Sequence, residues 1–285
     1  MKQKVSDYIA DHIAEWGIRD VFTVTGGGAM HMNDAFGHHP KLHCTYQHHE
    51  QACAMAAEAY ARVDNRMAAV CVTTGPGATN AITGILGGWM DSIPMIVFSG
   101  QARYATTVPA SGLRLRSMGV QECNIVPVVT PLTKFAHMVV HPENIRYYLE
   151  KALYLATNGR PGPVWLDIPL DVQGAMIETE DLKGYDPSEN PEETPAEISS
   201  EIIKTILDKI ENSHRPVIIP GNGVRLAGAI DDFHRLVELL GVPVVTGMSS
   251  VDALESDHPY FAGRSGGTGN RAGNFAVQTV MCFFP

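Results

Sequence analysis

The chain of 285 residues has few charged side chains and no basic cluster. Only 18% of its residues are Asp, Glu, Lys or Arg, and the formal net charge at pH 7 is −10. Proteins that bind nucleic acid present a basic face or stripe, which this sequence lacks. We therefore expect no nucleic-acid partner.

Cysteines are also few, and no two of them form a CxxC motif. The five are Cys44, Cys53, Cys71, Cys123 and Cys282. Their odd number and wide spacing indicate a reducing compartment and argue against a zinc site. The N-terminal residues lack the apolar core of a signal peptide, and no uncharged apolar run reaches membrane-spanning length. We expect a cytoplasmic protein with no membrane contact and no metal-ligand set of its own.

Apolar residues are abundant, at 45% of the chain, and they form short runs that alternate with helical patterns. This alternation predicts βα units and a mostly parallel sheet. The expected strands are residues 21–24, 43–47, 68–73, 94–99 and 163–168. The expected helices are residues 5–16, 50–62 and 143–157, with two more ending near residues 36 and 90. We predict an α/β fold: a doubly wound, mostly parallel sheet with helices on both faces.

Residues 186–195 are acidic, rich in proline and without hydrophobic anchors, which is typical of a linker. A second α/β pattern follows, with helices expected at 198–210 and 231–240 and strands at 216–219 and 242–246. We predict a first domain at 1–172, a linker at 173–197 and an incomplete α/β domain at 198–285. Residues 251–285 contain one further turn-rich stretch and a terminal apolar segment at 280–285, which we expect to be too little to close a second sheet.

Glu50 lies at the start of an alanine-rich, nearly uncharged helix that follows the predicted strand 43–47. A carboxyl group that is desolvated by apolar neighbours holds its proton more readily and can share it with a bound heterocycle. An alternative is that Glu50 only complements the helix dipole, as acidic residues in a first turn often do. The carboxyl edge of an open α/β sheet is where ligands bind, which favours the functional interpretation.

Two glycine clusters follow predicted strands, at residues 26–28 and 75–77. Glycines at a strand end let the backbone approach a ligand closely. In the second cluster Pro76 fixes one dihedral angle and forms a rigid apolar ledge, and Asn80 lies one helical turn beyond it. Neither cluster is a GxGxxG or GxxxxGK[ST] motif, so a nucleotide-binding function has little support. The alternative that each cluster is an ordinary tight turn stays open.

The chain carries an ordered set of motifs over about its first 172 residues. They are Gly26-Gly27, His49-Glu50-Gln51, Gly75-Pro76-Gly77-Ala78-Thr79-Asn80, Asp91-Ser92-Ile93-Pro94, Gly100-Gln101 and Gly159-Arg160-Pro161-Gly162-Pro163. This set resembles the pyrimidine-binding domain of thiamine-diphosphate enzymes, and within them it is most similar to the acetolactate synthase group. The resemblance continues more loosely into the family's central domain.

The resemblance implies roles for individual residues. Glu50 matches the catalytic glutamate that hydrogen-bonds the aminopyrimidine ring of the cofactor and shares a proton with it. Gln121 matches a substrate-side glutamine. The cofactor-binding residues that the resemblance implies are Val24, Gly26, Gly27, Glu50, Pro76 and Asn80.

The resemblance also implies an activity: decarboxylation of a 2-keto acid such as pyruvate and transfer of the acyl unit to an acceptor. The family's active site forms between subunits of a dimer or tetramer, so we expect a homo-oligomer. Val120 stands where acetolactate synthases carry an aromatic residue, and Thr25 stands where a proline commonly precedes the two glycines. These departures leave the acceptor substrate open.

In this family, Mg²⁺ and the cofactor's diphosphate bind a C-terminal domain that carries a Gly-Asp-Gly segment, and this sequence contains none. We therefore expect Mg²⁺ to be held by a domain outside this sequence. Two hypotheses stay open. The chain is either the N-terminal portion of such an enzyme, inactive alone, or a non-catalytic fragment or assembly module.

Overall fold

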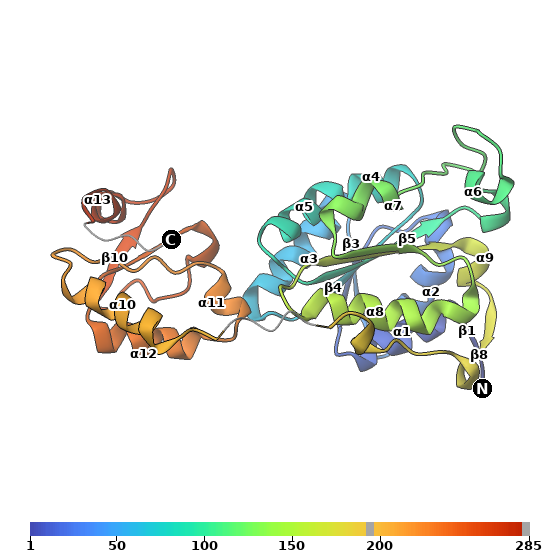
Figure 1. Ribbon diagram of the computed structural model, residues 1–285. Helices are drawn as coiled ribbons and strands as arrows, with labels where there is room; N and C mark the ends of the chain where they lie inside the picture. Colours follow the sequence, from blue (N-terminus) through green and yellow to red (C-terminus); the bar gives the residue numbers. More distant parts are fainter. Residues whose placement is uncertain (192–196, 281–285) are drawn as a thin grey trace. The chain divides into compact units, whose positions relative to one another are not determined.

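The structure is a computed structural model that describes residues 1–191 and 197–280 (Figure 1). The chain divides into two compact units, Met1–Glu193 and Thr194–Pro285. Two predicted segments lie partly outside the described residues: the linker at residues 192–196, and the C-terminal segment at residues 281–285. The predicted domain limits at residues 172 and 197 therefore stay a prediction.

The first unit contains a six-stranded parallel sheet in the order β3-β2-β4-β5-β7-β6. Its strands are β2 (Asp20–Thr23), β3 (His43–Tyr46), β4 (Ala68–Val72), β5 (Met95–Gln101), β6 (Phe135–Met138) and β7 (Pro163–Pro169). The strand order reverses between β2 and β4, as in doubly wound sheets. All residues of β4, β5 and β7 are buried, which explains their continuous apolar sequence. The predicted fold class is confirmed.

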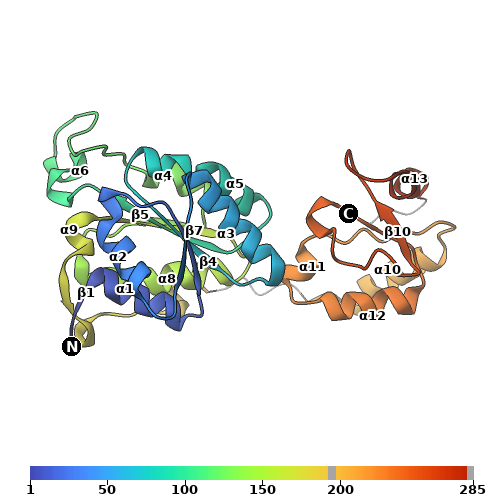
Figure 2. The ribbon, with the colours of Figure 1, turned by 180° about the vertical axis from the view of Figure 1, so that it is seen from behind.

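Helices cover both faces of this sheet (Figures 1 and 2). One face carries α1 (Val5–Glu15), α2 (Met30–His38) and α8 (Ile145–Thr157), and the other carries α3 (Glu50–Asp64), α4 (Pro76–Asn80) and α5 (Ile82–Met90). Short helical segments connect them: η1 (Gly27–Ala29), η2 (Tyr104–Thr106), α6 (Val108–Ser111), α7 (Val126–Val129), η3 (Thr130–Leu132), η4 (Pro142–Asn144), α9 (Leu170–Gln173), η5 (Thr179–Asp181) and η6 (Pro187–Glu189).

Side chains alternate between the two faces along β5 and β7. Ile96, Phe98 and Leu166 belong to the core that α1, α2 and α8 cover. Ser99 and Asp167 are paired neighbours in the parallel register and stand at the alternate positions. They therefore lie on the face that α3 and α5 cover, near the carboxyl ends of their strands.

Several short elements differ from the prediction, and two of them have a clear physical reason. The edge strand β6 was not predicted, because its four residues are only half-buried and too few to show a period. The predicted strand 216–219 is wrong: Ile218 forms only an isolated bridge with Val244. Pro216 and Pro220 bound that run and lack the N–H groups that a ladder requires.

A small antiparallel pair joins the start of the chain to the segment that follows β7. β1 (Lys2–Lys4) pairs with β8 (Met176–Glu178). The backbone N–H of Thr179 donates to the Met1 carbonyl oxygen at 3.0 Å and extends the pairing. The beginning of the first unit therefore lies beside its last strand.

The second unit is smaller and contains the parallel strands β9 (Val244–Thr246) and β10 (Phe261–Arg264). Its helices are α10 (Ser200–Glu211), α11 (Gly223–Leu226), α12 (Ile230–Leu240) and α13 (Arg271–Thr279), and η7 (Met248–Ser250) follows β9. Its core consists of Phe233, Val237, Val244, Ala253 and Leu254. Across both units, the described helices are all too short or too polar to cross a membrane.

Candidate active site

Glu50 is the first residue of α3, at the carboxyl end of β3, and its side chain is half-buried. The Asn80 side chain, at the end of α4, donates from Nδ2 to Glu50 Oε2 at 2.7 Å. The same nitrogen lies 3.3 Å from His49 Nε2. The structure thus places two of the sequence-predicted cofactor residues in direct contact, and one carboxylate oxygen of Glu50 is held by an amide donor.

The turn that precedes α4 leaves room beside this carboxylate. A Cβ atom added to Gly77, the second residue of α4, would overlap Thr73 Cγ2 at 2.7 Å and make an ordinary contact with Glu50 Oε1 at 3.4 Å. Pro76 opens α4 and is exposed. The packing of Pro76 against a ligand, as an apolar ledge, stays a prediction.

The first glycine cluster packs against the same turn. A Cβ atom on Gly26 would overlap the Thr73 side chain, and the Gly28 backbone N–H donates to Thr73 Oγ1 at 3.0 Å. Gly27, by contrast, faces open space and is exposed. The half-buried Val24 directly follows β2. The glycines bring the β2–α2 turn onto the β4–α4 turn, and only Gly27 presents free backbone outward.

Gln121 lies at the same edge of the sheet. Its φ angle is 55°, in the left-handed region that few side chains adopt. A Cβ atom on Gly75, whose φ is 62°, would overlap the Gln121 carbonyl oxygen. The backbone of the predicted substrate-side residue therefore rests on the turn that leads into Pro76, and its side chain is exposed.

Glu122 organises the segment that carries Gln121. Its carboxylate accepts from the backbone N–H groups of Val108 at 2.6 Å, Met118 at 2.7 Å and Gly119 at 2.9 Å. Burial alone would raise the pKa of Glu122. The three backbone donors together lower that pKa by more, so the net shift is downward. The Glu122 side chain thus ties together the segment from Val108 to Gly119.

Sequence reasoning missed Asn33, which supports the first glycine turn. Its Oδ1 accepts from the Gly26 backbone N–H at 3.3 Å, and its Nδ2 donates to Thr23 Oγ1 at 3.1 Å. Thr23 in turn donates to the Cys71 carbonyl at 2.8 Å. An amide at a half-buried position of α2 was the available signal, but its partners lie on other elements.

The geometry suits an aminopyrimidine ring. Such a ring needs a carboxyl group for its nitrogen and small or apolar residues against its faces, and Glu50, Pro76 and Gly77 supply both. Within residues 1–191 and 197–280, no three His, Cys, Asp or Glu side chains gather in a way that could hold a metal ion. The role of Glu50, Pro76 and Asn80 toward a pyrimidine ring stays a prediction.

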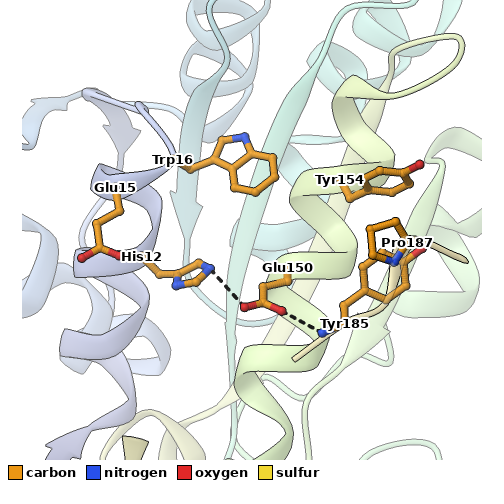
Figure 3. A pocket seen from close by; sticks show the side chains of 7 residues that line it. All are labelled: His12, Glu15, Trp16, Glu150, Tyr154, Tyr185 and Pro187. Atoms are coloured by element: carbon orange, nitrogen blue, oxygen red, sulfur yellow. Dashed lines mark hydrogen bonds and ion pairs between the residues drawn. The ribbon is translucent and has the colours of Figure 1, made fainter. Parts of the chain in front are cut away.

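A separate pocket of about 340 Å³ lies between α1 and α8, away from these residues (Figure 3). Glu150 stands in it between His12 and Tyr185, and accepts from the Tyr185 backbone N–H at 2.7 Å. Burial lowers the pKa of His12, although Glu150, 4.0 Å from its Nε2, opposes the shift. None of the sequence-predicted site residues lines this pocket.

Comparison with known families gives two matches. Residues 3–128 match the thiamine pyrophosphate enzyme N-terminal TPP-binding domain, and residues 203–281 match the central domain of the same enzymes. Thiamine pyrophosphate is the same compound as thiamine diphosphate. The two matches follow the chain in the order that the sequence motifs imply.

Individual relatives support the same family. The chain is 32% identical to an acetolactate synthase large subunit of Lactococcus lactis over 274 residues, covering 95% of this chain and 46% of the relative. It is 36% identical to a probable acetolactate synthase large subunit of Methanocaldococcus jannaschii, covering 92% and 43%. It is 30% identical to the Escherichia coli acetolactate synthase isozyme 3 large subunit, covering 98% and 47%. The chain thus spans a little under half the length of these relatives. It belongs to the thiamine-diphosphate-dependent enzyme family and is acetolactate synthase-like.

Proposed function

We propose that this chain supplies the pyrimidine-binding half of an acetolactate synthase-like active site. The enzyme would decarboxylate a pyruvate-like 2-keto acid and transfer the acyl unit to an acceptor. The observation that carries the proposal is the 2.7 Å hydrogen bond from Asn80 to Glu50 at the carboxyl edge of the sheet. The resemblance of the motifs and the matched family domains support it.

In this proposal each residue has a defined task. Glu50 is the catalytic residue, and its Oε1, which Gly77 leaves uncrowded, shares a proton with the pyrimidine ring. Asn80 fixes Oε2 and so orients the carboxylate. Pro76 packs against the ring. Thiamine diphosphate, when bound, supplies the carbon nucleophile that attacks the keto carbon.

The remaining predicted residues belong to the side that faces the substrate. Gly27 presents backbone without a side chain, and Val24 and Gly26 hold the turn behind it. Gln121, exposed at the same edge, contacts the 2-keto acid. These assignments place donor binding between the two glycine turns and the Gln121 segment.

Assembly completes the proposed site. The cofactor's diphosphate and Mg²⁺ would bind a separate domain, and the site would form between subunits of a homodimer or tetramer. The spacing of the cysteines supports a reducing, cytoplasmic environment, and Cys44, Cys53, Cys71 and Cys123 are free thiols in the structure.

Calorimetry with thiamine diphosphate and Mg²⁺ tests the proposal on the 285-residue chain. We expect weak binding through the pyrimidine ring alone, because the diphosphate site belongs to another domain. Glu50→Gln should weaken it at least about tenfold, equivalent to about 1.4 kcal/mol, because the proton-sharing carboxyl group is lost. Glu143→Gln, which changes a well-exposed carboxylate elsewhere, serves as the matched control and keeps the wild-type affinity. Equal affinities for wild type and Glu50→Gln would contradict the role of Glu50.

The alternative function, a non-catalytic assembly module, makes the opposite prediction. It expects no heat of binding from the wild-type chain and no activity when a diphosphate-binding chain is added. Our proposal expects that such an addition gives cofactor-dependent pyruvate consumption. We further expect Glu50→Gln to reduce that rate by about a hundredfold or more.

A further inference from the structure

A chain of buried hydrogen bonds ends on the carboxylate of Asp167. Ser99 Oγ donates to Asp167 Oδ1 at 2.6 Å, and Gln101 Nε2 donates to Asp167 Oδ2 at 3.1 Å. Trp165 Nε1 donates to Ser99 Oγ at 2.8 Å. All four side chains are buried, none more than 1% exposed. The carboxylate is thus buried with neutral donors on both of its oxygens.

Gln101 connects this carboxylate to two segments of the candidate active site. Its Nε2 also donates to the Cys123 carbonyl oxygen at 2.8 Å, two residues beyond Gln121. Its Oε1 accepts from Thr74 Oγ1 at 2.8 Å, directly before Gly75. One amide group therefore links the substrate-side segment, the β4–α4 turn and the buried carboxylate.

The direction of these bonds matches an ionised Asp167. An ionised carboxylate only accepts hydrogen bonds, and both neighbouring side chains donate to it. A proton on Oδ2 would face the Gln101 amide nitrogen, which cannot accept it. Protonation of Oδ2 would therefore break the bond from Gln101 and leave a buried N–H without that partner. Protonation of Oδ1 would require the Ser99 hydroxyl to accept and to give up its own donation.

Burial of the Asp167 carboxyl group, in contrast, disfavours its ionised form. Desolvation raises the pKa of Asp167 to about 7, although the bonds from Ser99 and Gln101 lower it. The Cys123 thiol faces the same carboxyl group, and its own pKa is raised first by burial and then by Asp167 and Glu122. His137 of β6 pairs with Leu166 and stacks on Tyr148 of α8, on the other face of the sheet. Burial and the two donors thus act in opposite directions on the ionisation of Asp167.

We propose that Asp167 is a positioning residue, whose ionised carboxylate holds Gln101 so that Gln101 keeps the Gln121 segment against the Thr74–Gly75 turn. The substrate side of the site is then ordered when Asp167 is ionised and loosened when it is protonated. The inference rests on the proposed function only where it names Gln121 as a substrate contact.

Trp165 offers a direct readout, because its indole N–H is two hydrogen bonds away from Asp167. The chain has three tryptophans, and ¹⁵N-labelling of them gives three indole resonances, assigned with Trp16→Phe and Trp89→Phe variants. We expect the Trp165 resonance to shift with pH, with a midpoint near 7, and to stop doing so in Asp167→Asn. His137→Gln and Cys123→Ser serve as controls and keep the shift.

A Trp165 resonance that stays constant from about pH 5.5 to about pH 8.5 would overturn the proposal, and so would an unchanged titration in Asp167→Asn. The wild-type titration decides the question even where the variant does not fold. Amide hydrogen exchange provides the second measurement. At a pH above the midpoint, residues 119–124 should exchange faster in Asp167→Asn than in wild type, while α1 exchanges equally in both. Equal exchange at residues 119–124 would contradict the link through Gln101.

The free energy of unfolding gives a third measurement, and the sign of its pH dependence is defined. The pKa of Asp167 is raised in the folded state from 3.8 to about 7, so its contribution to stability is full below pH 3.8 and is lost as the pH rises through 7. Asn cannot ionise. The advantage of wild type over Asp167→Asn in the free energy of unfolding should therefore shrink across this interval, and a constant difference would contradict it. None of these measurements uses the cofactor, so a failure to bind thiamine diphosphate would count against the proposed function alone.

Discussion

At the scale of single residues, Gly75 is the most constrained position of the candidate site. It combines a φ of 62° with a close approach to the Gln121 carbonyl oxygen. A side chain there meets two separate penalties, a left-handed backbone and a steric overlap. Gly27 has neither, because the space around its Cβ position is empty.

This contrast gives a matched pair of substitutions. Gly75→Ala should lower the free energy of unfolding by about 2 kcal/mol or more, and Gly27→Ala should change it by less than about 0.5 kcal/mol. Urea denaturation of the two variants measures both values. Similar stabilities for the pair would show that the Gln121 segment does not rest on Gly75.

The sequence singles out candidate site residues more readily than the partners of those residues. Glu50 and Asn80 stood out through short motifs, and the structure places them in contact. Asn33 and Gln101 were not predicted as site residues. Their partners, Gly26 and Asp167, lie on different elements, and a polar residue in a helix or strand pattern does not reveal which distant group it will meet.

At the scale of elements, close packing against α5 holds α3, the helix that begins with Glu50, in place. Figure 2 shows these two helices side by side. A Cβ atom on Gly84 of α5 would lie 2.5 Å from Ala54 Cβ and 2.7 Å from the Met55 nitrogen. Gly87, one turn later, has only an ordinary contact, 3.8 Å from Glu58 Oε1. Small residues at the crossing therefore let the two backbones approach each other.

We expect Gly84→Ala to destabilise the first unit by about 1–3 kcal/mol, because the helices must separate. Gly87→Ala should instead stabilise it by about 0.5–1 kcal/mol, because alanine favours the helix and meets no obstacle. Thermal or urea unfolding of both variants provides the measurement. A stabilising Gly84→Ala would mean that the two helices do not cross at Ala54.

The buried strands were predictable and the edge strand was not, for a physical reason. β4, β5 and β7 are covered on both faces, so their sequences are continuous apolar runs. Within the part of the chain that the structure describes, β6 pairs with β7 alone and is half-buried throughout, so the sequence of Phe135–Met138 carries little pattern. The predicted strand at 216–219 shows the converse error, since this apolar run bounded by prolines forms isolated bridges and no strand.

At the scale of the whole molecule, the two units differ in how deeply their helices are buried. The first has a six-stranded sheet covered on both faces, while α10 of the second, described along its full length, has no buried residue. Ile202 and Ile203 of α10 are 52% and 48% exposed. We therefore expect the second unit to unfold first.

Tryptophan fluorescence distinguishes the unfolding of the first unit from that of the second, because Trp16, Trp89 and Trp165 all belong to the first unit. In a urea titration, far-UV circular dichroism should show a transition at lower urea than tryptophan fluorescence. Adding a reporter in α13 with Phe275→Trp, at a position that is 64% exposed, should make fluorescence report the early transition too. Coincident transitions by both probes would show that the units unfold as one.

The pairing of β1 with β8 has a practical consequence for protein engineering. Lys2–Lys4 runs antiparallel to Met176–Glu178, so a version of the sheet-bearing unit cut after Glu178 has its two ends side by side. A circular permutant that joins these ends needs only a short Gly-Ser linker, with new termini in an exposed loop such as residues 112–118. The same geometry suits this unit as a guest domain, entering and leaving a host protein at adjacent points of one surface loop.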